Sequence, residues 1–343
     1  MAVTVRDQIW RTTLLTLLWA MAVVGSGPPQ SGDQTQPFTL KENVHLVIVP
    51  VSVKDRDGRL VPDLTRDDFR VFEDGKQRPV QYFSNELTPI SALVLLDTGM
   101  SAKSLATVRS QLRSLSNAFG PSDEVALYFF DKHIRLGQDF TSKTDLIVDA
   151  VEREAKAGRV EGKGPGVLGG PLAGSSPTIN GVNVDNPGSA PTLSAPITKS
   201  IHDALYEAAQ QLRYRPEGRR RLVLILSDGA GGSNTFSYQD MVNALEVAKA
   251  TVYAVSFSAG WAAKRADLLA RVARDTGGDI AYVRRSSGLD AACFLFADES
   301  RNAYVLGFTP SVADGKFHAI SVRASRSGVR LVARNRFFAP PLK

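Results

Sequence analysis

The middle of this chain alternates short apolar runs with amphipathic stretches, and this alternation restricts the possible folds more than any other feature. The apolar runs cover residues 90–97, 124–131, 221–228, 251–258 and 279–284. The amphipathic stretches between and after them cover residues 104–119, 144–156, 201–214, 238–249 and 263–275. Continuous Val/Ile/Leu strands that alternate with helices indicate a parallel sheet covered on both faces. We therefore predict a doubly wound, mostly parallel α/β domain over residues 89–300, with a ligand site beyond the carboxyl ends of its strands.

Both ends of the chain have a different residue pattern, which is typical of antiparallel strands. Residues 44–88 contain β-rich runs interrupted by the turn sequences Asp55–Gly58 and Glu73–Gly75. Residues 301–343 contain further strand-like runs separated by Gly-containing turns. Each segment is too small to bury two faces alone. We predict that they pair as one small β-sandwich, into which the α/β domain is inserted.

The first 43 residues indicate export. Arg6 and Arg11 precede an apolar run at 13–24, and small residues follow it, which predicts a signal peptide over residues 1–26. Residues 27–43 are polar and rich in Pro and Gly, as in a linker. The prediction is a secreted or periplasmic protein without an integral membrane span after signal cleavage. Residues 159–196, rich in Gly, Pro, Ser and Asn, are predicted to form a long flexible loop.

Composition excludes several function classes. The 343 residues carry 41 Lys and Arg against 35 Asp and Glu, so both signs are abundant and nucleic-acid binding is not indicated. The single cysteine, Cys293, rules out an internal disulfide and a thiolate zinc finger, and we expect it to pack as a small hydrophobe. His133 and His202 stand outside any nucleophile motif, and no phosphate-binding loop sequence occurs. The sequence favours a non-enzymatic protein.

Two of the predicted strands end in carboxylates. Asp97 closes the first strand of the α/β domain and opens the turn that contains Gly99 and Ser101. Asp228 ends the strand at 221–228 and precedes a glycine-rich loop. Carboxylates and hydroxyls that converge from neighbouring strands suit a hard cation such as Mg²⁺. The alternative is that both carboxylates only cap the turns and helices that follow them.

These motifs resemble those of von Willebrand factor A (VWA) domains. The runs "VPDLTRDDFRVFEDGK" and "YVLGFTP" further resemble the acidobacterial VWFA-related family, whose β extensions flank such a domain. The resemblance implies a Rossmann-like fold with a metal-ion-dependent adhesion site (MIDAS) that binds Mg²⁺, Mn²⁺ or Ca²⁺. Asp97, Ser101 and Asp228 match its ligand positions. In that family an acidic residue of a protein partner completes the metal shell, so the resemblance implies a protein partner bound in this way.

The match departs from the family pattern at two ligands. Gly99 stands where the first ligand Ser is expected, and Lys199 stands at the position of the loop Thr. Thr198, one residue away, is the predicted substitute, with Ser200 as a weaker one. The leading hypothesis is a secreted, adhesion-like binding protein with a partly degenerate MIDAS of Asp97, Ser101, Asp228 and Thr198. The alternative is a metal-independent structural scaffold of an exported complex.

An aspartic protease is a remote alternative, because Asp97–Gly99 reads Asp-Thr-Gly and the same tripeptide recurs at Asp275–Gly277. Such enzymes need two carboxyls that share a proton. The second tripeptide ends a helical pattern rather than a strand, and the α/β alternation is foreign to an all-β protease.

A basic cluster follows the helical stretch at 201–214. It consists of Arg213, Arg215 and Arg219–Arg221. Basic residues suit helix C-termini, so we expect these arginines to form a solvated helix end rather than a surface for an acidic partner.

Overall fold

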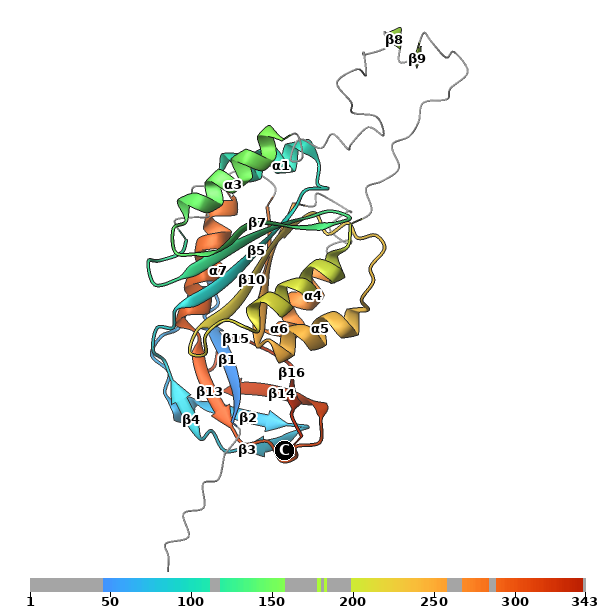
Figure 1. Cartoon of the computed structure of the whole chain (residues 1–343). Coiled ribbons are helices and arrows are strands. Elements are labelled where there is room, and N and C mark those ends of the chain that lie inside the picture. The colour runs from blue at the N-terminus through green and yellow to red at the C-terminus, as the bar shows by residue number, and fades with distance from the viewer. Residues whose placement is uncertain are drawn as a thin grey trace, which may run out of the picture. The chain divides into compact units, whose positions relative to one another are not determined.

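The computed structural model describes residues 46–111, 118–157, 178–179, 182–183, 199–257, 267–283 and 288–341 (Figure 1). The predicted signal peptide, the predicted linker and Thr198 lie outside these ranges. The predicted loop at 159–196 also lies outside them, apart from the short pair β8 (Thr178–Ile179) and β9 (Val182–Asn183). Within the described ranges, no helix is both long and apolar enough to cross a membrane.

A six-stranded sheet forms the centre of the α/β domain, in the order β12-β11-β10-β5-β6-β7. Its strands are β5 (Ile90–Asp97), β6 (Glu124–Phe130), β7 (Ile134–Thr141), β10 (Arg220–Ser227), β11 (Ala250–Ser256) and β12 (Ile280–Tyr282). All neighbours are parallel except β6 and β7, which pair antiparallel. The predicted mostly parallel sheet is confirmed. The sequence did not predict β7, because this edge strand is only half-buried and has no apolar run.

Helices cover both faces of this sheet (Figure 1). One face packs against α1 (Ala102–Ser110), α3 (Asp145–Lys156) and α7 (Leu289–Asn302), and the other against α4 (Ile201–Leu212), α5 (Tyr238–Val247) and α6 (Asp267–Thr276). Val94 and Leu96 of β5 join the first core, whereas Leu93 and Leu95 join the second. This division follows from the alternation of side chains along a strand. Cys293 is buried in the first core, as predicted, and burial raises the pKa of its thiol to about 12.

Both ends of the chain build the β-sandwich. Its first sheet has the order β15-β1-β13-β4 and its second the order β16-β14-β2-β3. The strands are β1 (Val47–Lys54), β2 (Phe69–Glu73), β3 (Lys76–Arg78), β4 (Tyr82–Ser84), β13 (Tyr304–Phe308), β14 (Lys316–Ala324), β15 (Arg330–Ala333) and β16 (Arg336–Ala339). Val49 pairs with Leu306, and Val71 pairs with Val322. Every long strand of the N-terminal segment therefore has a C-terminal partner, as the sequence predicts.

Buried ion pairs connect the sandwich to the α/β domain. Lys54 of β1 lies with its Nζ 2.6 Å from Glu299 Oε2 on α7 and 3.1 Å from Asp279 Oδ2 before β12. Arg334, after β15, pairs with Glu246 of α5 at 2.9 Å. Because Lys54, Glu299, Arg334 and Glu246 are all buried, separating these partners would leave uncompensated charges. The sandwich is thereby held against the end of the sheet where β10 begins.

Candidate functional site

The strand order places the candidate site at the centre of the sheet. β6 follows β5 on one side and β10 lies on its other side, so the winding direction reverses between β5 and β10. In open α/β sheets, ligand sites form at the carboxyl ends of the strands at such a reversal. Asp97 is the last residue of β5, and Asp228 directly follows β10. The sequence-based expectation that these two carboxylates converge is met.

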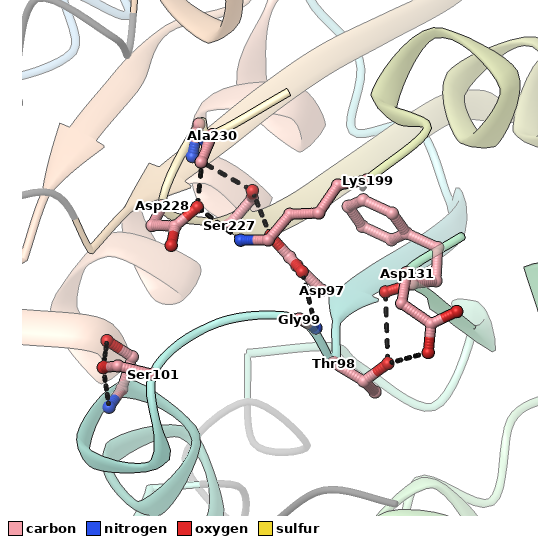
Figure 2. Close-up of polar contacts among 12 residues, drawn as sticks. Asp97, Thr98, Gly99, Ser101, Asp131, Lys199, Ser227, Asp228 and Ala230 are labelled. Carbon is pink, nitrogen blue, oxygen red and sulfur yellow. Dashed lines mark hydrogen bonds and ion pairs between the residues drawn. The ribbon is translucent and has the colours of Figure 1, made fainter. Parts of the chain in front are cut away.

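The group on which they converge is the ammonium of Lys199 (Figure 2). Its Nζ donates to Asp97 Oδ2 at 3.0 Å and to Asp228 Oδ1 at 2.6 Å. The Asp97 side chain is fully buried and that of Lys199 is 4% exposed, whereas that of Asp228 is 29% exposed. We call Asp97, Lys199 and Asp228 the lysine triad. Hydrogen bonds between ionised partners that are withdrawn from water are among the stronger polar contacts in proteins.

Main-chain contacts hold Lys199 in place just before α4. Its carbonyl accepts a hydrogen bond from Gly232 N at 2.8 Å, in the loop after β10. The adjacent Ser200 donates its N–H to the carbonyl of Asp131 after β6, and its hydroxyl to the carbonyl of Ser233. Segments that follow β6 and β10 therefore fix the residue whose side chain bridges β5 and β10.

Further polar contacts surround the buried carboxylate of Asp97. Its Oδ2 also accepts the Ser227 hydroxyl at 2.6 Å, and its Oδ1 accepts Gly99 N at 2.9 Å. Burial raises the pKa of Asp97 to about 6, against the opposing effects of Lys199 and Ser227. Ser227 is a site residue that the sequence reasoning missed. Its signal was its place as the last residue of β10, directly before Asp228 and beside the end of β5.

Ser101 does not join the triad. It is the N-cap of α1, and its hydroxyl accepts a hydrogen bond from Ser104 N at 3.2 Å. Its side chain is exposed and lies apart from the triad in Figure 2. In this arrangement the Ser101 hydroxyl caps the helix that the turn begins, and its predicted role as a metal ligand stays a prediction.

Gly99 and Lys199, the two departures from the family pattern, explain each other. A Cβ atom at position 99 would lie 2.9 Å from Lys199 Cε and 3.3 Å from Lys199 Cγ. Gly99 is not in the left-handed region of backbone conformation. Glycine suits this position because its missing side chain leaves space for the aliphatic stem of Lys199.

A divalent ion does not fit the site as its side chains are placed. The Lys199 ammonium fills the position between the carboxylates, Gly99 offers no hydroxyl, and the Ser101 hydroxyl is directed to α1. Among the residues that the structure describes, no group of three or more His, Cys, Asp or Glu side chains could hold a metal ion. Thr198 lies outside these residues. A tethered ammonium supplies the positive charge that the predicted Mg²⁺ would have supplied.

A second polar cluster supports the turn after β5. The Thr98 hydroxyl donates to Asp131 Oδ2 at 3.0 Å, and Arg135 Nη1 lies 3.1 Å from the same oxygen. Asp131 Oδ1 also accepts a hydrogen bond from His133 N at 2.9 Å. These contacts join the ends of β5 and β6 beside the triad.

The two Asp-Thr-Gly sequences do not form a common site. Asp97 contacts Lys199 and Ser227, as described above. Asp275, near the end of α6, accepts hydrogen bonds from Tyr238 Oη at 2.7 Å and Asn335 Nδ2 at 3.1 Å. The two carboxylates therefore share no hydrogen-bond partner in the described part of the chain.

Neither a protein-family profile nor a curated protein sequence matches this chain. Solved structures similar to it include an aerotolerance-related membrane protein from Bacteroides fragilis, at 14% identity and a TM-score of 0.40, covering 62% of this chain and 98% of that one. The VWA domain of SpRpn10 is 10% identical, with a TM-score of 0.34 over 60% of this chain and 93% of that one. Proximal thread matrix protein 1 of the mussel byssus, with a zinc-occupied MIDAS motif, is 11% identical, with a TM-score of 0.41 over 63% and 49%.

The α/β part of this chain has a doubly wound, Rossmann-like fold of the kind that VWA domains share. Its own topology carries that assignment: a mostly parallel six-stranded sheet, helices on both faces, an antiparallel edge strand, and carboxylates at the central reversal of strand order. It differs from a domain with an intact MIDAS in having the lysine triad at that reversal.

Proposed function

We propose that this chain is a non-enzymatic protein-binding module of an exported protein, and that its VWA-like domain works without a metal ion. The observation that carries the proposal is the Lys199 ammonium between Asp97 and Asp228. It satisfies the two carboxylates that would otherwise attract a divalent cation. The predicted signal peptide at 1–26 supports export, to the periplasm or the cell exterior.

The charge of the triad argues against recognition of an acidic partner residue at this site. A divalent ion between two carboxylates neutralises both and retains open coordination positions for a partner oxygen. One ammonium between two ionised carboxylates leaves a net charge of minus one. Lys199 is also too deeply buried to meet a partner, whereas Asp228 is partly exposed. The triad therefore serves as an internal lock, and the group it offers to a partner is a carboxylate, which suits a basic residue or a hydrogen-bond donor.

Calorimetric titration of Mg²⁺ and Mn²⁺ into the purified protein tests metal independence. We expect no saturable heat at about 1 mM ion, because binding would require the ammonium to leave two buried or half-buried partners. An Asp97→Asn variant is the matched control for heat that arises elsewhere on the chain. Saturable binding that Asp97→Asn removes would instead support the metal-dependent, adhesion-like hypothesis.

The binding role needs a separate measurement. Chemical cross-linking in the native host, followed by mass spectrometry, should recover the same partner from cells treated with EDTA or with added Mg²⁺. An Asp228→Asn variant should recover less of it if the exposed carboxylate takes part in binding. A partner recovered only with Mg²⁺ would contradict metal independence, and recovery of none by the folded protein would favour the scaffold alternative.

A further inference from the structure

A cavity of about 470 Å³ lies at the opposite end of the sheet from the lysine triad. It opens between the β-sandwich and the base of the α/β domain, where β1, β4 and β13 face the beginnings of β10 and β11. Its lining includes Arg219, Arg220 and Arg334 together with Tyr82, Leu87 and Tyr253. Cavities that hold small ligands are commonly of this size, with apolar walls and a few polar groups that fix the ligand's orientation.

Arg220 is the unusual residue of this lining. Its exposure is only 9%, so the prediction of a solvated basic cluster is wrong at this position. Its Nη2 donates to the carbonyl of Ala303 at 2.8 Å, but its Nε is buried without a hydrogen-bond partner. No carboxylate forms an ion pair with Arg220 in the parts of the chain that the structure describes. A buried guanidinium without a counter-ion is costly, because it has lost its hydration and gained no opposite charge.

The neighbouring arginines of the cluster are satisfied, which sets Arg220 apart. Arg219 donates to Ser91 Oγ and to the carbonyl of Ile90, and its Nε lies 3.5 Å from Glu124. Arg221 donates to the carbonyls of Ala248 and Arg215. The side chains of Arg219 and Arg221 bind the protein itself, so among Arg219–Arg221 only Arg220 has a buried nitrogen without a partner in the described ranges.

Arg334 adds a second buried positive charge to the same cavity. It is 5% exposed, and its Nη1 donates to Glu246 Oε2 at 2.9 Å. Its Nε and Nη2 have no hydrogen-bond partner among the described residues. Burial and the charge of Arg334 together lower the pKa of Arg220 to about 10, with burial the larger cause. The acidic lining residues Glu86 and Glu217 are exposed and do not form ion pairs with either arginine in the described ranges.

We propose that this cavity binds a small organic anion, whose carboxylate or phosphate group pairs with Arg220 and whose apolar body packs against the cavity wall. A guanidinium fork is suited to both kinds of oxyanion. Tyr82 and Leu87 are exposed at 44% and 68%, so they leave apolar surface for the body of the ligand to cover. Such a ligand would bridge the sandwich and the α/β domain, far from the lysine triad, and the proposal does not depend on the function proposed above.

Calorimetry with four probes tests this site: benzoate, phenyl phosphate, inorganic phosphate and neutral benzyl alcohol. We expect benzoate or phenyl phosphate to bind with a Kd below about 1 mM, at least tenfold tighter than benzyl alcohol and inorganic phosphate. The stronger of the two organic anions identifies the oxyanion class. Equal binding of inorganic phosphate would indicate an adventitious ion only, and absence of saturable binding by every probe at about 10 mM would overturn the proposal.

Two variants of Arg220 and one control variant assign the binding. Arg220→Met should abolish it, while Arg213→Met, at an exposed arginine outside the cavity, should leave it unchanged. Arg220→Lys retains the charge without the fork and should bind at least tenfold more weakly, which keeps the test open if Arg220→Met does not fold. Unchanged affinity in a folded Arg220→Lys or Arg220→Met variant would place the binding elsewhere and overturn the assignment.

Discussion

Replacing Lys199 by Met is the sharpest perturbation of the lysine triad, because methionine retains most of the apolar stem but loses the ammonium. Asp97 would keep the Ser227 hydroxyl and Gly99 N–H as partners but would lose its counter-ion while remaining fully buried. Removing one partner of a buried pair typically costs about 3–5 kcal/mol. Asp228 adds little to this figure, because its partial exposure lets water replace the ammonium. We therefore expect Lys199→Met to lower the free energy of unfolding by about 3 kcal/mol at pH 7.

Urea unfolding followed by circular dichroism measures this loss, and a double-mutant cycle assigns it. Adding Asp97→Asn removes the stranded carboxylate, so the double variant should recover about 2 kcal/mol relative to Lys199→Met alone. Lys103→Met is the matched control, because Lys103 is an exposed lysine of α1, away from the lysine triad, and its replacement should change stability by less than about 0.5 kcal/mol. A cost below about 1 kcal/mol for Lys199→Met, or the same cost with and without Asp97→Asn, would refute the charge argument.

Four further outcomes are expected. Gly99→Ser should destabilise the protein by about 1–3 kcal/mol, because the new side chain would contact the Lys199 stem. Adding Lys199→Thr should relieve this strain and create Mg²⁺ binding that calorimetry can measure. A folded double variant that binds no ion would contradict this expectation. Because burial raises the pKa of Asp97 from 3.8 to about 6, wild type should keep this group's contribution to stability fully below pH 3.8 and lose about 3 kcal/mol of it as the pH rises through 6. Denaturation curves at pH 4 and pH 7 measure this loss, which should be absent from Asp97→Asn. Native Cys293 should resist thiol reagents that label it in urea, since its pKa is about 12; rapid native labelling would be inconsistent with its burial. Deleting residues 303–343 should remove β13–β16 and cause aggregation, seen by size-exclusion chromatography, whereas a monomer with an unchanged melting curve would show that the two ends of the chain do not stabilise one another.

The fold could be predicted from local sequence patterns, because the spacing of apolar residues reflects which side chains are buried. Continuous apolar strands such as 90–97 predicted the parallel sheet, and the structure has β5 over the same residues. The hydrophobic runs near both termini predicted a composite sandwich, since neither could bury its surface alone. β7 was missed because an edge strand with one partner and half-buried side chains does not need an apolar run.

The positions of the site carboxylates were also accessible, because carboxyl ends of neighbouring parallel strands meet at one edge of a sheet. Asp97 and Asp228 could thus be paired from their places in the sequence. The cation between them could not, since Lys199 looked like a departure from a ligand pattern until its stem was seen to pass over Gly99. Ser101 likewise suits either an ion or a helix N-terminus, and only the path of the chain decides between them.

Arg220 shows the same division at the other end of the sheet. A run of arginines after a helix is compatible with a solvated surface. The local sequence does not show whether a segment from elsewhere in the chain will cover these arginines. The sandwich, built from residues far away in the chain, covers Arg220 and leaves its Nε unpaired, whereas Arg219 and Arg221 find hydrogen-bond partners within the α/β domain. Periodic burial is a local property of the sequence, so it was predictable. The charge balance of a buried site depends on side chains that separate elements bring together, and therefore only the tertiary structure decided that balance.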